Sequence, residues 1–155
     1  MAAAHPEERL AELGLKLPDV AKPAGAYVPA LRNGSLVYTS GQVPFVDGAL
    51  AGTGKVGAEV SPERGKELAG ICALNALAAV KAEIGDLAKV KRVVKVLAFV
   101  ASDPSFAGQP GVANGASELL GSVFGEAGVH VRSAVGVAVL PLDAPVEVEI
   151  VVEVE

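Results

Sequence analysis

The chain has 155 residues, of which 51% are hydrophobic and 20% are charged, a composition that fits one globular domain and excludes wholesale disorder. Its net charge of −5 and its aromatic content of 4% argue against nucleic acid as a partner, because phosphate and base binding use clustered cations and stacking platforms. The single cysteine cannot form an internal disulfide and no stretch reaches the ~18 apolar residues of a membrane span, so we expect a soluble, cytoplasmic protein with no membrane partner.

Residues 1–24 predict a short helix followed by a connector. An acidic turn and two leucines three residues apart, Leu10 and Leu13, precede Gly14, a pattern typical of a short helix with a glycine stop. We expect this helix to lie as an appendage on the surface. Residues 25–155 then form the main part of a single globular domain.

Two strands are expected next, at residues 27–31 and 35–40, joined by the hairpin dipeptide Asn-Gly at 33–34. The tripeptide Ser-Pro-Glu at 61–63 supplies an N-cap hydroxyl, a first-turn proline and an acid near the positive end of the helix dipole. A long helix should therefore begin there and run to about Ile84.

The second half predicts a valine-rich strand at 92–101, a helix at about 112–125 and two terminal strands separated by a reversal at 141–145. The order strand, helix, strand occurs twice, which implies crossover connections between parallel strands. The hairpins add antiparallel strand pairs. We predict an α+β fold in which a mixed β-sheet has two helices packed on one face. Its other face would expose a large apolar patch, so we expect an oligomer that packs sheet against sheet.

Two chemically suggestive features favour structural roles. The segment GTGKVG at 52–57 matches a phosphate-binding glycine pattern, but the helix starts several residues later and Val56 stands where a phosphate loop needs Ser or Thr. A mobile glycine-rich connection is therefore favoured, and a phosphate site stays the alternative. Cys72 falls near the apolar stripe of the long helix and is expected to be a small buried thiol.

Arg132 is the charged residue that the strand pattern does not explain. Alternate residues of a strand point to opposite faces, so the valines at 129, 131, 135, 137 and 139 are predicted to fill a core. The opposite face then carries His130, Arg132, Ala134, Gly136 and Ala138. A guanidinium on a face whose other side chains are mostly small leaves space for a ligand. Its planar pair of N–H donors suits the carboxylate of a small molecule. His130 is a candidate to line the same site.

A salt bridge between Arg132 and Glu147, Glu149 or Glu153 on the last strand is the structural alternative. The reversal at 141–145 puts Arg132 and Glu147 near opposite ends of their strands, roughly 20 Å or more apart at ~3.3 Å per residue. If these two side chains share a site, two subunits must build it.

With these residues assembled, the sequence resembles the RidA family, also called the YjgF family of reactive-intermediate imine deaminases, from about residue 25 to 154. The most specific match is VRSAVGVAVLPLDAPVEVEI, which resembles the family's arginine on a strand, Leu-Pro turn and glutamate on the last strand. GAYVPA, YTSGQVP and VANGASELLGSVFG are similar to family segments as well. The resemblance implies a chorismate-mutase-like fold, a homotrimer with clefts between subunits, and no metal or other cofactor.

The implied activity is hydrolysis of small 2-imino or enamino acids to 2-oxo acids and ammonia. By the same resemblance, Arg132 holds the substrate carboxylate, Glu147 holds the imine nitrogen or the attacking water, and the backbone carbonyl of Ala134 orients that water. The pocket is expected to be lined by Tyr27, Ser40, Gly41 and Asn114, some of them from a neighbouring subunit.

Two other functions stay open at this point. One is a trimeric protein that binds a small carboxylate without turning it over. The other is ribonuclease activity or translation inhibition, which fits the acidic chain and its few aromatic residues less well.

Overall fold

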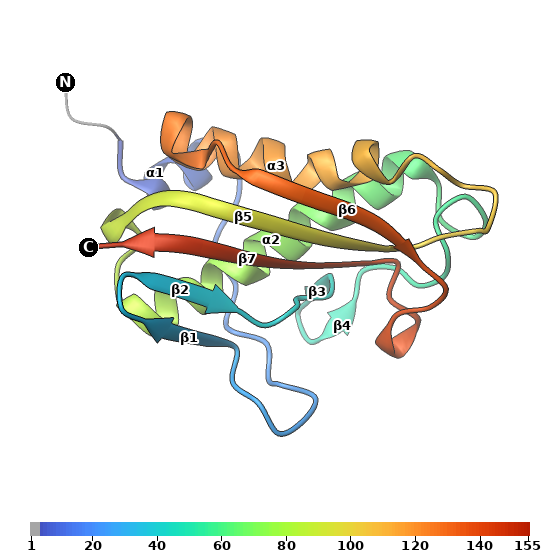
Figure 1. The fold of residues 1–155 in the computed structure, drawn as a ribbon, viewed down its shortest axis with the longest axis horizontal. Helices are drawn as coiled ribbons and strands as arrows, with labels where there is room; N and C mark the ends of the chain where they lie inside the picture. Colours follow the sequence, from blue (N-terminus) through green and yellow to red (C-terminus); the bar gives the residue numbers. More distant parts are fainter. Residues whose placement is uncertain (1–3) are drawn as a thin grey trace.

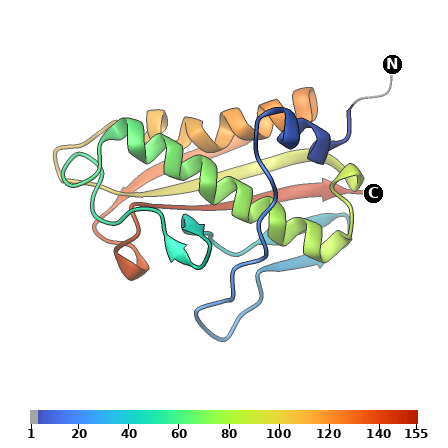
Figure 2. The ribbon, with the colours of Figure 1, turned by 180° about the vertical axis from the view of Figure 1, so that it is seen from behind.

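The computed structural model describes residues 4–155. Its elements follow the predicted order and form a curved sheet with the long helices behind it (Figures 1 and 2). In chain order they are α1 (Pro6–Glu12), β1 (Ala30–Asn33), β2 (Leu36–Thr39), β3 (Phe45–Val46), β4 (Ala49–Leu50), α2 (Pro62–Ile84), β5 (Val90–Ala101), α3 (Gln109–Phe124), β6 (Val131–Val137) and β7 (Val146–Val154). Three short 3₁₀ turns lie at Leu87–Lys89, Gly125–Gly128 and Pro141–Asp143.

The main sheet has the order β1-β2-β7-β5-β6, and β3 pairs with β4 in a separate hairpin. Strands β5 and β6 are parallel, as the intervening helix α3 requires, and the other neighbouring pairs are antiparallel. The predicted mixed sheet is therefore confirmed. The two terminal strands do run in opposite directions, but β5 lies between them.

Helices α2 and α3 cover one face of the sheet, as predicted, and the core lies between the two layers (Figure 2). Helix α2 starts where its capping signal indicates, because the Ser61 side chain accepts a hydrogen bond from the backbone N–H of Arg64. It ends at Gly85, whose φ of 86° lies in the region that glycine adopts without strain. The residues of β5 and β7 that face the helices are mostly valines, which fill the space beneath them.

Two element boundaries differ from the prediction. Helix α3 begins at Gln109 rather than near residue 112, because Pro110 occupies the first turn, where a helix needs no N–H from that residue. Strand β1 begins at Ala30, directly after Pro29, which has no N–H to donate to a ladder. The turn through Gly34 is formed as expected, with a φ of 63°.

The glycine-rich segment at 52–57 is anchored to the body of the protein through Val56. Val56 is fully buried, and its N–H donates to the carbonyl of Ala101. The following helix starts only at Pro62 and is capped by its own Ser61 side chain. These contacts fit the predicted structural connection between strands.

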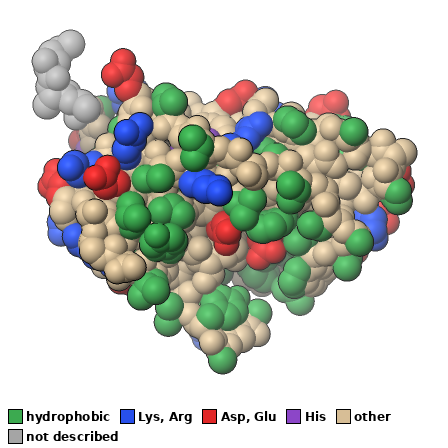
Figure 3. Space-filling view, viewed as in Figure 1, with side chains coloured by type: hydrophobic (Ala, Val, Ile, Leu, Met, Phe, Trp, Pro, Cys, Tyr) green, Lys and Arg blue, Asp and Glu red, His purple; other side chains and the backbone are tan. Residues whose placement is uncertain are grey.

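The predicted orientation of β6 is wrong within one chain. Its alternate valines face away from the helices, and Val131 keeps 66% of its surface exposed. Arg132 and Ala134 instead face the helix layer, where they pair with Val96 and Ala98 of β5. The reason is that small residues on β6 let α3 approach closely, so the valines are left on the uncovered face. Apolar side chains spread over this open face, with acidic groups near its middle (Figure 3).

Helix α1 is more than a surface appendage. Its Leu10 side chain is only 1% exposed and belongs to the main core. The His5 ring caps the helix by accepting from the N–H of Glu7 and contacts Asp86 at 2.8 Å. Within residues 4–155, none of the helices combines the length and the hydropathy needed to cross a membrane.

Candidate functional site

Arg132 lies on the edge strand β6 and reaches over the start of α3. Its Nη1 atom donates to Asn114 Oδ1 at 2.8 Å and to Ser117 Oγ at 3.2 Å. Its Nη2 atom donates to the carbonyl oxygen of Pro110 at 3.3 Å. Two of the residues singled out in the sequence, Arg132 and Asn114, are therefore in direct contact. Within residues 4–155 its acceptors are all neutral, so they leave the positive charge of the guanidinium uncompensated.

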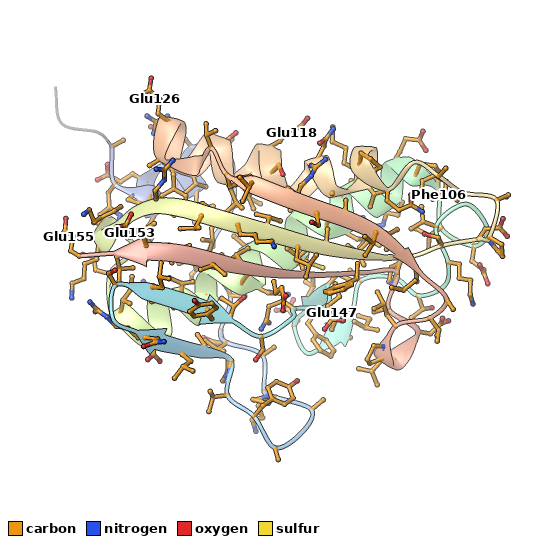
Figure 4. All side chains as sticks on the ribbon, in the orientation of Figure 1. Phe106, Glu118, Glu126, Glu147, Glu153 and Glu155 are labelled. Atoms are coloured by element: carbon orange, nitrogen blue, oxygen red, sulfur yellow. The ribbon has the colours of Figure 1, made fainter. Side chains whose placement is uncertain are left out.

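The structural alternative for Arg132 is excluded within one chain. Glu147, Glu149 and Glu153 project from the opposite face of the sheet, and within residues 4–155 Arg132 forms no ion pair. Glu147 and Glu153 lie toward opposite ends of β7 (Figure 4). Within residues 4–155 no carboxylate pairs with the guanidinium, so it is available to a ligand or to another chain.

Glu147 stands in a cleft of about 320 Å³ on the open side of the sheet. The cleft is lined by Ala21, Lys22, Pro23, Ala24, Tyr27, Pro29, Gly41, Gln42, Val43, Phe45, Pro141, Leu142 and Glu147. Gly41 makes the room for the carboxyl group, because a side chain at residue 41 would collide with Glu147 Oε1. Tyr27 and Gly41, both predicted to line a pocket, thus share one cleft with Glu147.

Burial raises the pKa of the Glu147 carboxyl group, and the negative charge of Glu149 on the same face raises it further. A carboxyl group with a raised pKa gains a proton more readily than an exposed glutamate, which suits it to proton transfer. Glu147 is therefore the best-placed acid or base of the cleft.

Tyr27 lines the cleft, whereas Ser40, which was also predicted to line it, is not among its lining residues and lies next to Gly41 in the chain. The Ser40 hydroxyl donates to the carbonyl of Val28 at 2.6 Å, and the Tyr27 hydroxyl accepts from the N–H of Ala24 at 3.2 Å. These bonds fold residues 24–29 into the loop that borders Glu147. Half of the Tyr27 side chain is left exposed.

Ala134 belongs to the Arg132 side of the sheet. It pairs with Ala98 of β5 and is packed against the main core. Because it has only a methyl group, any contribution to polar chemistry must come from its backbone. Ala134 lies on the helix-facing side with Arg132, and Glu147 lies on the other side.

The predicted site residues therefore form two half-sites on opposite faces of the sheet. The first, the arginine half-site, consists of Arg132, Asn114 and Ala134; the second, the glutamate half-site, consists of Tyr27, Ser40, Gly41 and Glu147. Two strand spacings and three residue steps separate Arg132 from Glu147, which puts their Cα atoms roughly 14 Å apart. This is shorter than the predicted 20 Å, because β6 and β7 overlap along β5. The two groups still cannot meet around one small ligand within a single chain.

The sequence reading missed Ser117 and the Pro110 carbonyl beside Arg132, and Lys22 in the glutamate half-site. The spacing on α3 could have indicated Ser117, because residues three apart lie on one helix face and Asn114 had been singled out. The backbone carbonyl of Pro110 leaves no signal in a sequence. Across residues 4–155, no three His, Cys, Asp or Glu side chains are grouped so that they could hold a metal ion.

Comparison with known proteins identifies the family. A model of the family described as "YjgF/chorismate_mutase-like, putative endoribonuclease" matches residues 7–154. The chain belongs to the YjgF family. The match extends back to α1, so this helix is part of the family pattern in this chain.

Solved structures and a curated relative support the YjgF assignment. The protein Atu1372 of Agrobacterium tumefaciens, of unknown function, is 47% identical, with 96% of this chain and 91% of that chain covered and a TM-score of 0.89. A Shewanella oneidensis protein is 35% identical, with 97% and 100% covered and a TM-score of 0.95. Protein TCP17 of Trypanosoma cruzi is 47% identical over 154 residues, which is 99% of this chain and 96% of the relative. The predicted YjgF resemblance is therefore confirmed.

Proposed function

We propose that this protein is a hydrolase that converts small 2-imino or enamino acids into 2-oxo acids and ammonia, at clefts between the subunits of a homotrimer. The observation that carries the proposal is the presence of two groups: a guanidinium that has no carboxylate partner within residues 4–155, and a carboxyl group with a raised pKa in an open cleft. A 2-imino acid needs both, because it has a carboxylate to be held and a nitrogen to be protonated.

The separation of the half-sites supports an assembly of several chains. Arg132 and Glu147 face opposite sides of one sheet, so a composite site requires that the arginine half-site of one subunit meet the glutamate half-site of another. The exposed valines of β6 supply an apolar surface for such packing. A cyclic arrangement lets each chain contribute both halves to different sites.

The proposed reaction needs only bound water and proton transfer. Arg132 holds the substrate carboxylate through a charge-assisted fork, which fixes the imine carbon near Glu147 of the neighbouring subunit. Water adds to the imine carbon, and a proton passes through the Glu147 carboxyl group to the nitrogen. The C–N bond of the resulting carbinolamine then breaks, so that one imine and one water give one 2-oxo acid and one ammonia. Positioned proton transfer of this kind accelerates a reaction by about 10²- to 10⁴-fold.

The test is hydrolysis of 2-iminopropionate generated in situ by an amino-acid oxidase. Wild type should exceed the uncatalysed rate, whereas Arg132→Lys, which keeps the charge and loses the fork, and Glu147→Gln should each lose most of that acceleration. Glu126→Gln, on an exposed turn, is the matched control for loss of one carboxylate. A wild-type rate equal to the uncatalysed rate would contradict the proposal.

Binding and RNA-cleavage assays of wild type and an Arg132 variant separate the competing functions. A protein that only binds carboxylates would show no turnover, yet would bind 2-oxobutanoate in calorimetry and lose that binding in Arg132→Ala. The family description includes endoribonuclease activity, but the net charge of −5 opposes the approach of a polyanion. Salt-sensitive cleavage of RNA that Arg132→Ala abolishes would favour that activity instead.

A further inference from the structure

A chain of hydrogen bonds behind Arg132 ties the arginine half-site to the backbone. Ser117 Oγ lies 3.2 Å from Arg132 Nη1 and 2.8 Å from His130 Nε2. The other ring nitrogen, His130 Nδ1, lies 2.6 Å from the carbonyl oxygen of Gly128. All three side chains are partly buried between α3 and the start of β6.

The direction of each bond follows from what the groups can donate. A carbonyl oxygen only accepts, so His130 Nδ1 carries the proton that the Gly128 bond requires. In the neutral ring Nε2 is then an acceptor, and the Ser117 hydroxyl donates to it. The hydroxyl oxygen keeps its lone pairs for the N–H of Arg132. Each hydrogen bond thus determines which group donates and which accepts in the next hydrogen bond.

This network determines which part of the guanidinium is available. A guanidinium has five N–H groups, and within the described residues three of those of Arg132 are engaged by Asn114, Ser117 and Pro110. Both hydrogens of Nη1 are used, and one hydrogen of Nη2 is used. The Nε–H and the second Nη2 hydrogen are left for a ligand.

We propose that Ser117 and His130 are positioning residues that fix the guanidinium of Arg132, so that it presents Nε–H and one Nη2–H to the carboxylate of the substrate. The inference rests on the proposed function for the identity of the ligand, but the fixed guanidinium can be measured without substrate. Holding the fork in advance removes an ordering cost from binding, so its loss should appear in KM more than in kcat.

The substitutions that test this are Ser117→Ala, Ser117→Thr and His130→Leu, with Ser122→Ala on the exposed side of the same helix as the control. Thr keeps the hydroxyl that accepts from Arg132, whereas Ala removes it and Leu removes the acceptor behind it. Circular dichroism confirms that each variant is folded before comparison.

Two readouts are needed. The first is KM and kcat for 2-iminopropionate hydrolysis: we expect about a tenfold rise in KM with little change in kcat for Ser117→Ala and His130→Leu, and values near wild type for Ser117→Thr and Ser122→Ala. The second is the side-chain ¹⁵N spectrum of Arg132 without substrate. Wild type and Ser117→Thr should show separate, slowly rotating Nη groups, and Ser117→Ala should show averaged ones.

Each contrary result has a distinct meaning. Freely rotating Nη groups in wild type would overturn the positioning role whatever the activity. A fall in kcat at constant KM in Ser117→Ala would also overturn it, because Ser117 would then act in the chemistry. Absence of wild-type turnover would contradict the proposed deaminase function, while the ¹⁵N spectra would still decide whether Ser117 and His130 fix Arg132.

Discussion

At the scale of single residues, the glutamate half-site combines an acid and the glycine that admits it. Gly41 leaves space for the Glu147 carboxyl group in a partly buried cleft. Burial raises the pKa of that group, and the neighbouring charge of Glu149 adds to the effect. The same environment that suits proton transfer must therefore oppose ionisation of Glu147 in the folded protein.

The pH dependence of stability tests this environment. Because the folded-state pKa of Glu147 is raised above its unfolded value, the ionised group destabilises the fold at pH values above that raised pKa. Below the ordinary glutamate pKa, both states are protonated and the effect vanishes. We expect Glu147→Gln to have a higher free energy of unfolding than wild type at pH 7.5, and the difference to disappear near pH 3.5.

Urea unfolding at both pH values, at one fixed protein concentration, measures this difference. Glu126→Gln controls for the removal of one negative charge from a chain of net charge −5. If Glu147→Gln is less stable than wild type at pH 7.5, the carboxylate is stabilised by a contact and the raised pKa is wrong.

At the scale of elements, the long helices α2 and α3 cross at two glycines, Gly70 of α2 and Gly115 of α3. A Cβ atom added to Gly115 of α3 would collide with the backbone carbonyl oxygen of Lys66 on α2, and Gly70 lies beside Gly115 in the same crossing. This close approach sets the position of α3 against α2, and α3 carries the Asn114 and Ser117 side chains that contact Arg132 of β6.

Paired glycine substitutions on α3 test the crossing. Gly115→Ala should lower the free energy of unfolding by about 1–3 kcal/mol, because the helix must shift away from the Lys66 backbone. Gly121→Ala, with open space around it on the same helix, should raise the free energy of unfolding by up to about 1 kcal/mol through helix propensity. Chemical unfolding of both variants measures the contrast, and equal effects would contradict it.

The sequence predicts most elements here because their signals are local. The capping residue Ser61 and the Asn33-Gly34 turn each depend on neighbours a few residues away, and α2 and the first hairpin form where they indicate. The faces of β6 could not be predicted in the same way. Strand alternation separates Arg132 from the flanking valines, but which side the helices cover depends on long-range packing. For that reason the division of the site between two faces of the sheet emerges only from the fold.

At the scale of the whole molecule, the open face of the sheet has the composition of an interface. Helices cover the other face, while Val131 and Val135 of β6 are exposed on the open one. Apolar side chains gather on this open face (Figure 3). If the homotrimer that we propose forms through this surface, the apolar area of the surface is buried between chains. Assembly of the trimer then also completes each composite site.

Sedimentation of the purified protein tests this assembly. Wild type should have about three times the mass of one chain. Val131→Glu should shift the mass toward that of one chain and lower the deaminase rate by at least about tenfold, because a charge would be placed in a packed apolar contact. Leu13→Glu, an equally non-conservative change at an exposed leucine after α1, should leave both unchanged. Val131→Glu with the wild-type mass and rate would exclude this surface as the interface.

The place of β7 in the sheet has a consequence for how the chain is made. This strand is the last in sequence, yet it is hydrogen-bonded to β2 on one side and β5 on the other. During synthesis, β1 and β2 therefore emerge from the ribosome with no place in the final sheet until residues 146–154 follow them. The sheet therefore cannot close before residues 146–154 have been synthesised. Until then the edges of β2 and β5 that β7 will pair with have no partner strand, and unpaired edges of this kind favour aggregation during folding.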